Sequence, residues 1–156
     1  MKRIFLFSTL IFIIDQVVKL IVGFSINLNT SFTVINNFFY ISNVHNYGAA
    51  FSILYGSRIL LTIVSIVALI FIYYFMLKNK KFSWMEISIY SLLIGGILGN
   101  LFDRIVYGYV VDYLDFYLFG YDFPIFNIAD ICIVISAGLI LIDSFRGEKN
   151  ENSSRK

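Results

Sequence analysis

The sequence is poor in the residues on which many familiar active sites depend. Its 156 residues include one histidine, one cysteine and one proline, and only 14% of them are charged. Because His45 is the only histidine, a histidine-based zinc site and a serine triad are both disfavoured. Cys132 has no cysteine to pair with, and no base near it in the sequence would activate its thiol. No glycine-rich phosphate loop is present, and nothing indicates nucleic acid as a partner or requires a metal or another cofactor.

Apolar residues are what the chain has in abundance. It is 59% hydrophobic and 19% aromatic, whereas a soluble domain of this length needs more polar surface to cover its core. We therefore predict a single integral membrane domain over residues 1–156. Crossing a bilayer takes roughly 20 apolar residues in a helix. Four stretches qualify: 4–22, 59–77, 87–102 and 125–142.

The basic residues give the predicted spans an orientation, because cytoplasmic loops are enriched in lysine and arginine. Nine of the twelve basic residues precede the first span, separate the second from the third, or follow the fourth. This pattern predicts cytoplasmic termini and places segments 25–57 and 104–124 on the outer side. A cleaved signal peptide is the competing interpretation of the first span, but Asp15 and Lys19 interrupt its apolar core and no small-residue cleavage site follows.

The two outer segments are rich in β-formers and aromatic residues, which favour the headgroup region of a membrane. Residues 32–35 are expected to form a short strand, and the rest to be partly strand and partly short interfacial helix or loop. The polar tail, 148–156, is expected to be disordered. The predicted fold is therefore an all-α membrane protein, a four-helix transmembrane bundle with a small extracytoplasmic β-containing segment.

Two aspartates near the outer ends of the predicted spans are the strongest candidates for chemistry. Asp112 ends an apolar run, and Asp130 falls about one turn into the fourth span between apolar residues. A carboxylate there must be paired, hydrogen-bonded or protonated. If the two meet, repulsion and desolvation raise one pKa while the other group stays ionised. Such a pair can activate water and polarise a carbonyl, as in aspartic proteases. The plainer alternative is that Asp112 or Asn127 only caps a helix.

Further polar residues accompany these aspartates along the sequence. Asp15 and Lys19 are four residues apart and can pair on one helix face, either as a structural ion pair or in support of a site. An Asp103–Arg104 neighbour pair is usually structural, although the Arg104 fork could also hold a substrate carbonyl. Small residues let backbone or a neighbouring helix approach closely. The further candidates for a supporting role are Asn46, Gly48 and Asn100.

Taken in order, these motifs make the chain resemble the lipoprotein signal peptidase family, also called signal peptidase II. The matching residues run through almost the whole chain. They are Asp15-Gln16 with Lys19, Asn46-x-Gly48-Ala49-Ala50-Phe51-Ser52, Gly95-Gly96, Gly99-Asn100, Asp103-Arg104, Val111-Asp112-Tyr113 and Phe126-Asn127-x-Ala129-Asp130.

The resemblance implies an aspartic endopeptidase of the bacterial cytoplasmic membrane. It implies that Asp112 and Asp130 are the catalytic pair, and that Asn46, Asn100, Arg104 and Asn127 surround the pair or contact substrate. The implied substrates are prolipoproteins carrying a diacylglyceryl group on a cysteine, cut on the amino side of that cysteine. Membrane lipid is the other expected partner, and we expect a monomer. Ile97 and Tyr113 depart slightly from the family's usual residues.

Two other classes of function stay open from the residues alone. A small transporter could use Asp15, Lys19 and Asp130 as a proton or cation relay, since buried charges suit that role as well. Against it, the acidic residues cluster at one face and do not form a path across the membrane. A structural subunit without a site is disfavoured by the number of polar residues inside the spans.

Overall fold

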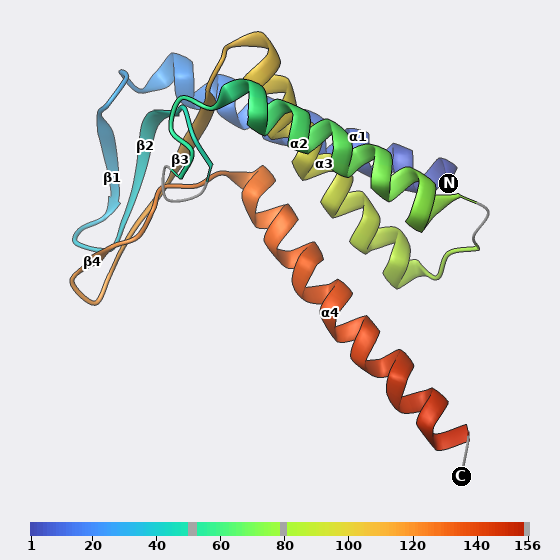
Figure 1. Cartoon of the computed structure of the whole chain (residues 1–156). Helices are drawn as coiled ribbons and strands as arrows, with labels where there is room; N and C mark the ends of the chain where they lie inside the picture. The colour runs from blue at the N-terminus through green and yellow to red at the C-terminus, as the bar shows by residue number, and fades with distance from the viewer. Residues whose placement is uncertain (50–52, 79–80, 155–156) are drawn as a thin grey trace.

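A computed structural model describes residues 1–49, 53–78 and 81–154 of the chain. Four long helices extend from a sheet at one end, and the last of them diverges from the others toward its C-terminal end (Figure 1). They are α1 (Lys2–Ser25), α2 (Arg58–Phe71) continued by a π-helical turn η2 (Ile72–Leu77), α3 (Trp84–Val106) and α4 (Ile128–Ser154). Each of the four is long and apolar enough to cross a membrane, so the four predicted spans correspond to four helices of a multi-pass membrane protein.

The helix ends differ from the predicted bounds for local reasons. α3 begins at Trp84, three residues before the predicted span, because Ser83 and Glu86 form a capping box. α4 begins at Ile128, three residues after the predicted start of its span. It continues to Ser154, where the sequence had suggested a disordered tail over 148–156. No proline follows Pro124, and the Glu and Lys residues near the end of the chain are good helix formers.

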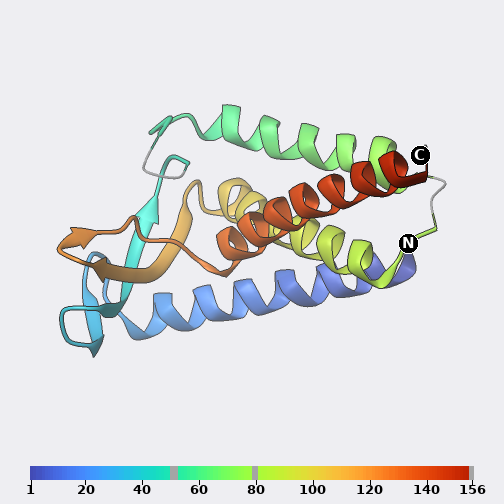
Figure 2. The same cartoon turned by 90° about the horizontal axis from the view of Figure 1, so that it is seen from below.

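The third helix is the centre of the bundle, and glycines allow its neighbours to approach. A methyl group on Gly95 would lie 2.9 Å from the backbone oxygen of Ser8 in α1, and one on Gly96 would lie 2.5 Å from that of Ala129 in α4. In Figure 2, α3 and α4 cross each other in the space between α1 and α2. In contrast, no residue of α2 is buried, so the apolar surface of this helix is left for lipid.

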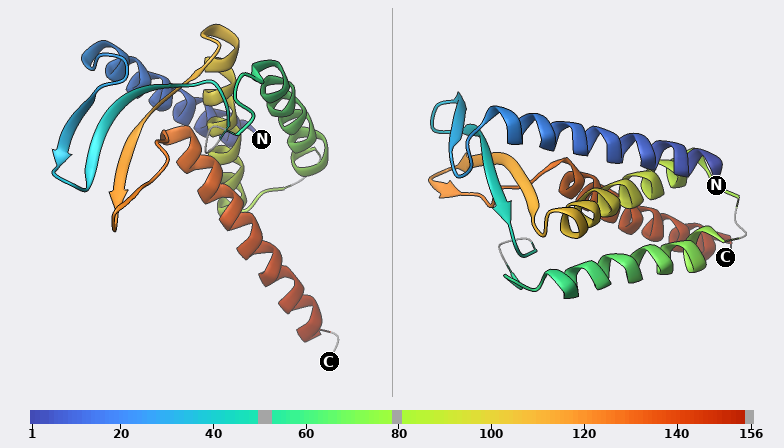
Figure 3. Two further views of the ribbon diagram at one scale, coloured as in Figure 1. Left: turned by 60° about the vertical axis from the view of Figure 1, so that its left-hand side comes forward. Right: turned by 90° about the horizontal axis from the view of Figure 1, so that it is seen from above.

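The outer segments form an antiparallel four-stranded sheet in the order β1-β2-β3-β4. The strands are β1 (Ser31–Ile35), β2 (Phe39–Asn46), β3 (Val110–Leu118) and β4 (Tyr121–Asp122). The predicted strand at 32–35 is confirmed as β1. The predicted interfacial helix is wrong for the described residues, where β-branched and aromatic side chains favour strands instead. The predicted β-containing segment is thus a small antiparallel sheet, which lies at one end of the helices in both views of Figure 3, and the chain as a whole is not all-α.

Candidate active site

Asp112 and Asp130 belong to two elements, β3 and α4, that lie side by side. Asp112 lies on β3 opposite Val44 of β2, and Asp130 lies in the first turn of α4. The chain between them folds back, so that Phe126 pairs with Leu114 in a short antiparallel bridge. This bridge sets the beginning of α4 beside the strand that carries Asp112.

One asparagine contacts both carboxylates. The Asn127 side-chain amide donates to Asp112 Oδ1 at 2.7 Å, and its backbone N–H donates to Asp130 Oδ2 at 3.1 Å. Its Oδ1 accepts from the Asp130 backbone N–H at 2.9 Å, which is the hydrogen bond of a helix cap. Asn127 is fully buried. The capping role anticipated for this residue is therefore present, and the same residue ties the two acids together.

Two further asparagines complete the hydrogen bonding of the pair. Asn46 Nδ2 donates to Asp112 Oδ2 at 2.8 Å, and Asn100 Nδ2 donates to Asp130 Oδ1 at 2.7 Å. Asn46 is held in turn by the Gly48 backbone N–H, which donates to its Oδ1 at 2.8 Å. Each of the four carboxylate oxygens thus accepts one amide N–H, and both acids are held in fixed orientations.

The surroundings of Asp112 favour its neutral form. Burial, followed by the nearby charge of Asp130, raises the pKa of Asp112 to about 7. The amide groups of Asn46 and Asn127 act in the opposite direction, because they donate to the ionised carboxylate. A carboxyl group with a pKa raised in this way holds its proton more readily, which is what a general acid requires.

A buried ionic cluster, formed by Asp15, Lys19 and Asp103, lies next to the pair. Lys19 Nζ lies 2.8 Å from Asp15 Oδ2 and 2.7 Å from Asp103 Oδ2, and it donates to Asn100 Oδ1 at 3.0 Å. The predicted pairing of Asp15 with Lys19 is confirmed. Asp103 contacts Lys19 and also accepts a hydrogen bond from Gln16 Nε2 at 2.9 Å. It does not pair with its sequence neighbour, Arg104. Since Asn100 also bonds Asp130, the cluster reaches one acid through a single side chain.

Arg104 points to the same region from the end of α3. Its guanidinium donates to the backbone oxygen of Gly48 at 3.1 Å and to that of Asn100 at 3.3 Å. Through Gly48 it braces the turn that follows β2. Arg104 also lines the cavity that the two acids share.

The two aspartates open onto one cavity of about 500 Å³. Its polar end is formed by both acids together with Asn46, Asn100 and Arg104. Its remaining wall is apolar and is formed by Ala49, by Val110, by residues 123–126, and by Ile131 and residues 133–135 of α4. A concave apolar site with a few convergent polar groups is the usual form of a ligand-binding pocket.

Some contributors to this site were not nominated from the sequence. The Ala129 backbone N–H donates to Asp15 Oδ1 at 3.0 Å, so the ionic cluster also fixes the start of α4. The Tyr113 hydroxyl accepts from the Ile128 N–H at 3.2 Å, and burial raises the pKa of this phenol. Tyr113 and Ala129 both belong to motifs of the family resemblance, but a hydrogen bond made by a backbone N–H leaves no signal of its own in the sequence.

Comparisons with known proteins agree on one family. A model of the family described as Signal peptidase (SPase) II matches residues 7–146. The lipoprotein signal peptidases of Staphylococcus aureus strains JH9 and Newman are each 42% identical over 147 residues, covering 94% of this chain and 90% of theirs. A solved bacterial membrane enzyme is 39% identical with a TM-score of 0.88, covering 96% of this chain and 92% of its own. A second is 40% identical with a TM-score of 0.81 and 92% coverage of both chains.

Proposed function

Because this chain belongs to the signal peptidase II family and is therefore a peptidase, we propose that it removes signal peptides from prolipoproteins with Asp112 and Asp130 as the catalytic pair. The observation that carries the proposal is the shared cavity, in which one asparagine bonds both acids. Relatives named for lipoprotein signal peptidase activity supply the substrate class.

In the proposed mechanism the pair holds one proton between its two carboxyl groups. The ionised carboxylate takes a proton from a water molecule, whose oxygen attacks the scissile carbonyl carbon. The protonated carboxyl group donates its proton to the carbonyl oxygen, which gives a tetrahedral diol. The first carboxyl then protonates the departing amide nitrogen as the C–N bond breaks, and the diol gives its proton back to the pair. Atoms and charges balance without a metal ion.

The apolar wall of the cavity suits a lipid-modified substrate. The α4 residues that line it beside the acids are Ile131, Ile133, Val134 and Ile135. Val134 and Ile135 are also exposed on the bundle surface. Acyl chains could thus lie along α4 while the peptide crosses the polar end. The wall thus suits a substrate cysteine that carries a diacylglyceryl group. Resemblance to the signal peptidase II family implies this modification, and it implies that the cut falls on the amino side of the cysteine.

The same reasoning gives the proposed setting of the enzyme. Basic residues near both termini and between α2 and α3 favour the cytoplasmic side for that end of the bundle. The sheet and the two acids then lie near the outer face of a bacterial cytoplasmic membrane. A monomer is expected, since one chain supplies every residue of the proposed site.

The test is cleavage of a purified diacylglyceryl-modified precursor in nanodiscs. Asp112→Asn and Asp130→Asn should each lower cleavage by at least about a thousandfold, as loss of a catalytic group does, while the proteins stay folded and inserted. Asp122→Asn is the matched control, because Asp122 is exposed on β4, and it should cleave normally. Retained cleavage in either cavity variant would exclude the pair.

Two further arms test the chemistry and the substrate separately. EDTA should leave cleavage unchanged, and inhibition reversed by a divalent cation would indicate a metallohydrolase instead. The unmodified precursor should be cleaved far more slowly than the lipidated one. Equal turnover of the two would remove the substrate assignment even where proteolysis itself survived.

A further inference from the structure

A second cavity, the α1–β2 cavity, lies on the other face of the strands that carry the acids. Its volume is about 370 Å³, within the range of roughly 300–1,000 Å³ that is usual for ligand pockets. Strand alternation separates the two spaces. Asn46 and Val110 border the catalytic cavity, whereas their neighbours His45 and Val111 border this one. The proposed peptidase mechanism makes no use of it.

The charged floor of this cavity offers no free cation. Lys19 and Asp103 line it, but the three ammonium protons of Lys19 are taken by Asp15, Asp103 and Asn100. Two carboxylates face one ammonium, so the formal charge of the cluster is negative when both acids are ionised. His45 forms part of the wall, and burial lowers its pKa, which disfavours the charged form of the ring. The cavity therefore disfavours an anion and favours a cation.

One buried acceptor in the wall lacks a partner. Asn43 is 4% exposed and lines the cavity. Its Nδ2 donates to the backbone oxygen of Ile26 at 2.7 Å, whereas its Oδ1 has no hydrogen-bond partner among the described residues. A buried carbonyl oxygen without a donor costs free energy. A ligand that brings an N–H or O–H group would remove this cost.

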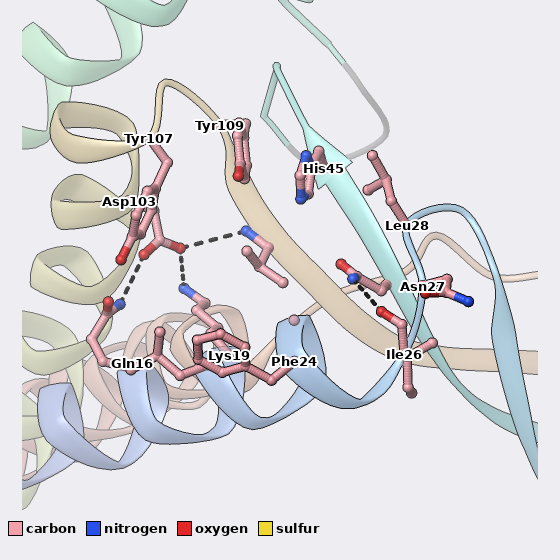
Figure 4. Close-up of a pocket in the computed structure, with 14 residues that line it drawn as sticks. Gln16, Lys19, Phe24, Ile26, Asn27, Leu28, His45, Asp103, Tyr107 and Tyr109 are labelled. Carbon is pink, nitrogen blue, oxygen red and sulfur yellow. Dashed lines mark hydrogen bonds and ion pairs between the residues drawn. The ribbon is translucent and has the colours of Figure 1, made fainter.

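The remaining walls point to an amphiphile. Figure 4 shows Gln16, Lys19 and Asp103 at one side of the cavity and Ile26 and Leu28 at the other. Aromatic rings form the far wall, where His45 and Tyr109 stack with centroids 3.6 Å apart. Apolar side chains from the end of α1 complete the lining, and two of them, Leu20 and Phe24, are 48% and 89% exposed on the span that faces lipid.

We propose that the α1–β2 cavity binds the headgroup of a membrane lipid that ends in a primary ammonium group, with its acyl chains along the outward face of α1. The ammonium group donates to Asn43 Oδ1 and lies over the net negative floor. Leu20 and Phe24 contact the first part of the acyl chains. A lipid is favoured over a soluble amine because polar floor and apolar mouth meet at the end of a membrane span.

The experiment compares two lipids that differ only in their hydrogen-bond donors. The intact protein is equilibrated with phosphatidylethanolamine or phosphatidylcholine of identical acyl chains, and retained lipid is counted by native mass spectrometry. One hydrogen bond to a charged group predicts a preference of roughly tenfold for phosphatidylethanolamine. A phosphatidylglycerol arm, with hydroxyl donors and a net negative charge, should be retained no better than phosphatidylcholine.

A filling variant ties the preference to this cavity. Gly23 lines the cavity, and a Cβ atom added there would meet no atom within 4 Å, so the larger side chain of Gly23→Phe should occupy the space and abolish the preference. Gly138→Phe is the matched control, a helical glycine with equally open surroundings in α4, and it should bind like the wild type. Equal retention of the two lipids by the wild type would overturn the proposal. So would a preference for phosphatidylglycerol, or the same preference in Gly23→Phe as in the control.

Discussion

Several charged side chains are buried around the two acids, and each of them has its own partner. Asp15, Lys19, Asp103 and Asp112 are between 0% and 4% exposed, and each has a partner of opposite charge or an amide donor. Burial of a charge is costly unless it is paired and hydrogen-bonded. The residues around the pair therefore offset the cost of burying charge, in addition to supporting the proposed catalytic pair.

The raised pKa of Asp112 predicts a pH limit for activity. As pH rises through about 7, the pair loses its shared proton, and no group remains to protonate the carbonyl oxygen. Cleavage should fall by about tenfold per pH unit well above this point. The measurement is kcat/KM against pH, which reports the pair as a unit. A profile that stays flat to pH 9 would contradict the shared proton.

The raised pKa of Asp112 also determines how the stability of the fold changes with pH. The pKa of Asp112 is raised from 3.8, the ordinary value of an aspartate, to about 7, so the folded protein holds a proton that the unfolded chain releases. The contribution of Asp112 to stability should therefore be fully present below about pH 4 and should decline as pH rises to about 7.

Asn46→Ala removes a donor to the ionised form of Asp112 and should move the alkaline limit of activity to higher pH.

Lys19 should be the most costly residue of the cluster to remove. Lys19→Met leaves Asp15 and Asp103 buried without their cation, and breaking a buried pair costs roughly 3–5 kcal/mol. Thermal unfolding in detergent measures the loss. The double variant with Asp103→Asn should lose less than the sum of the two single changes. A loss below about 1 kcal/mol for Lys19→Met would be typical of an exposed pair and would contradict this account.

At this scale the sequence was informative where polar residues interrupt apolar runs. Asp15, Lys19 and Asp130 stand out because such residues are rare inside membrane spans. Asn43 and His45 carry no comparable signal. Their cavity depends on which face of β2 turns toward α1, and a strand bulge between Ile41 and Val44 shifts that register in a way no local pattern predicts.

Among the elements, α3 carries the site by packing tightly against α1 and α4. Its glycines bring Asp15 of one helix and Ala129 of another within contact of the same backbone. A buried apolar cluster closes the bundle at the end away from the sheet; its members are Ile4, Ile72, Leu77, Ile87 and Ile94. The helix spacing at Gly96 and Gly99 therefore decides how closely the ionic cluster meets the start of α4.

Gly99→Ala should disturb both stability and cleavage. The added methyl group would collide with the Asp15 carboxylate and with the Ala129 side chain, and overpacking typically costs about 1–3 kcal/mol. Gly138→Ala, which meets no atom within 4 Å, is the control and should gain a few tenths of a kcal/mol or more from helix propensity. Equal unfolding temperatures for the two variants would show that the close approach at Gly99 is unimportant.

Element prediction succeeded for helices and only in part for strands. Long apolar runs identified four spans, because a helix of that length in lipid satisfies its own backbone. Of the four strands, only β1 was predicted. The others join residues far apart in the sequence, such as Val44 with Asp112, and their pairing depends on contacts that a local pattern does not contain.

For the whole molecule, the claim is that sheet and acids share the outer side of the membrane. A substitution to cysteine at exposed Phe119, in a Cys132→Ser background, should react with an impermeant maleimide in intact cells. A cysteine at exposed Lys78 should react only after the membrane is opened. Labelling of both sites, or of Lys78→Cys alone, in intact cells would contradict the proposed orientation.

The overall arrangement follows from sequence only as far as the order and direction of the spans. That Asp112 and Asp130 meet depends on the fold-back at Phe126, where strand β3 pairs with the residue before α4. The family resemblance anticipated this meeting, whereas the residues alone left enzyme and transporter both open. The comparisons favour the enzyme because the family itself is a peptidase family.

Joint action of the two acids is tested most directly by a double-mutant cycle on cleavage. The kcat/KM for a lipidated precursor is measured for wild type, Asp112→Asn, Asp130→Asn and the double variant. Groups that act as a unit are strongly non-additive, so the double variant should be no slower than either single variant. Losses that multiply in the double variant would mean that the two carboxylates act independently and would contradict the paired mechanism.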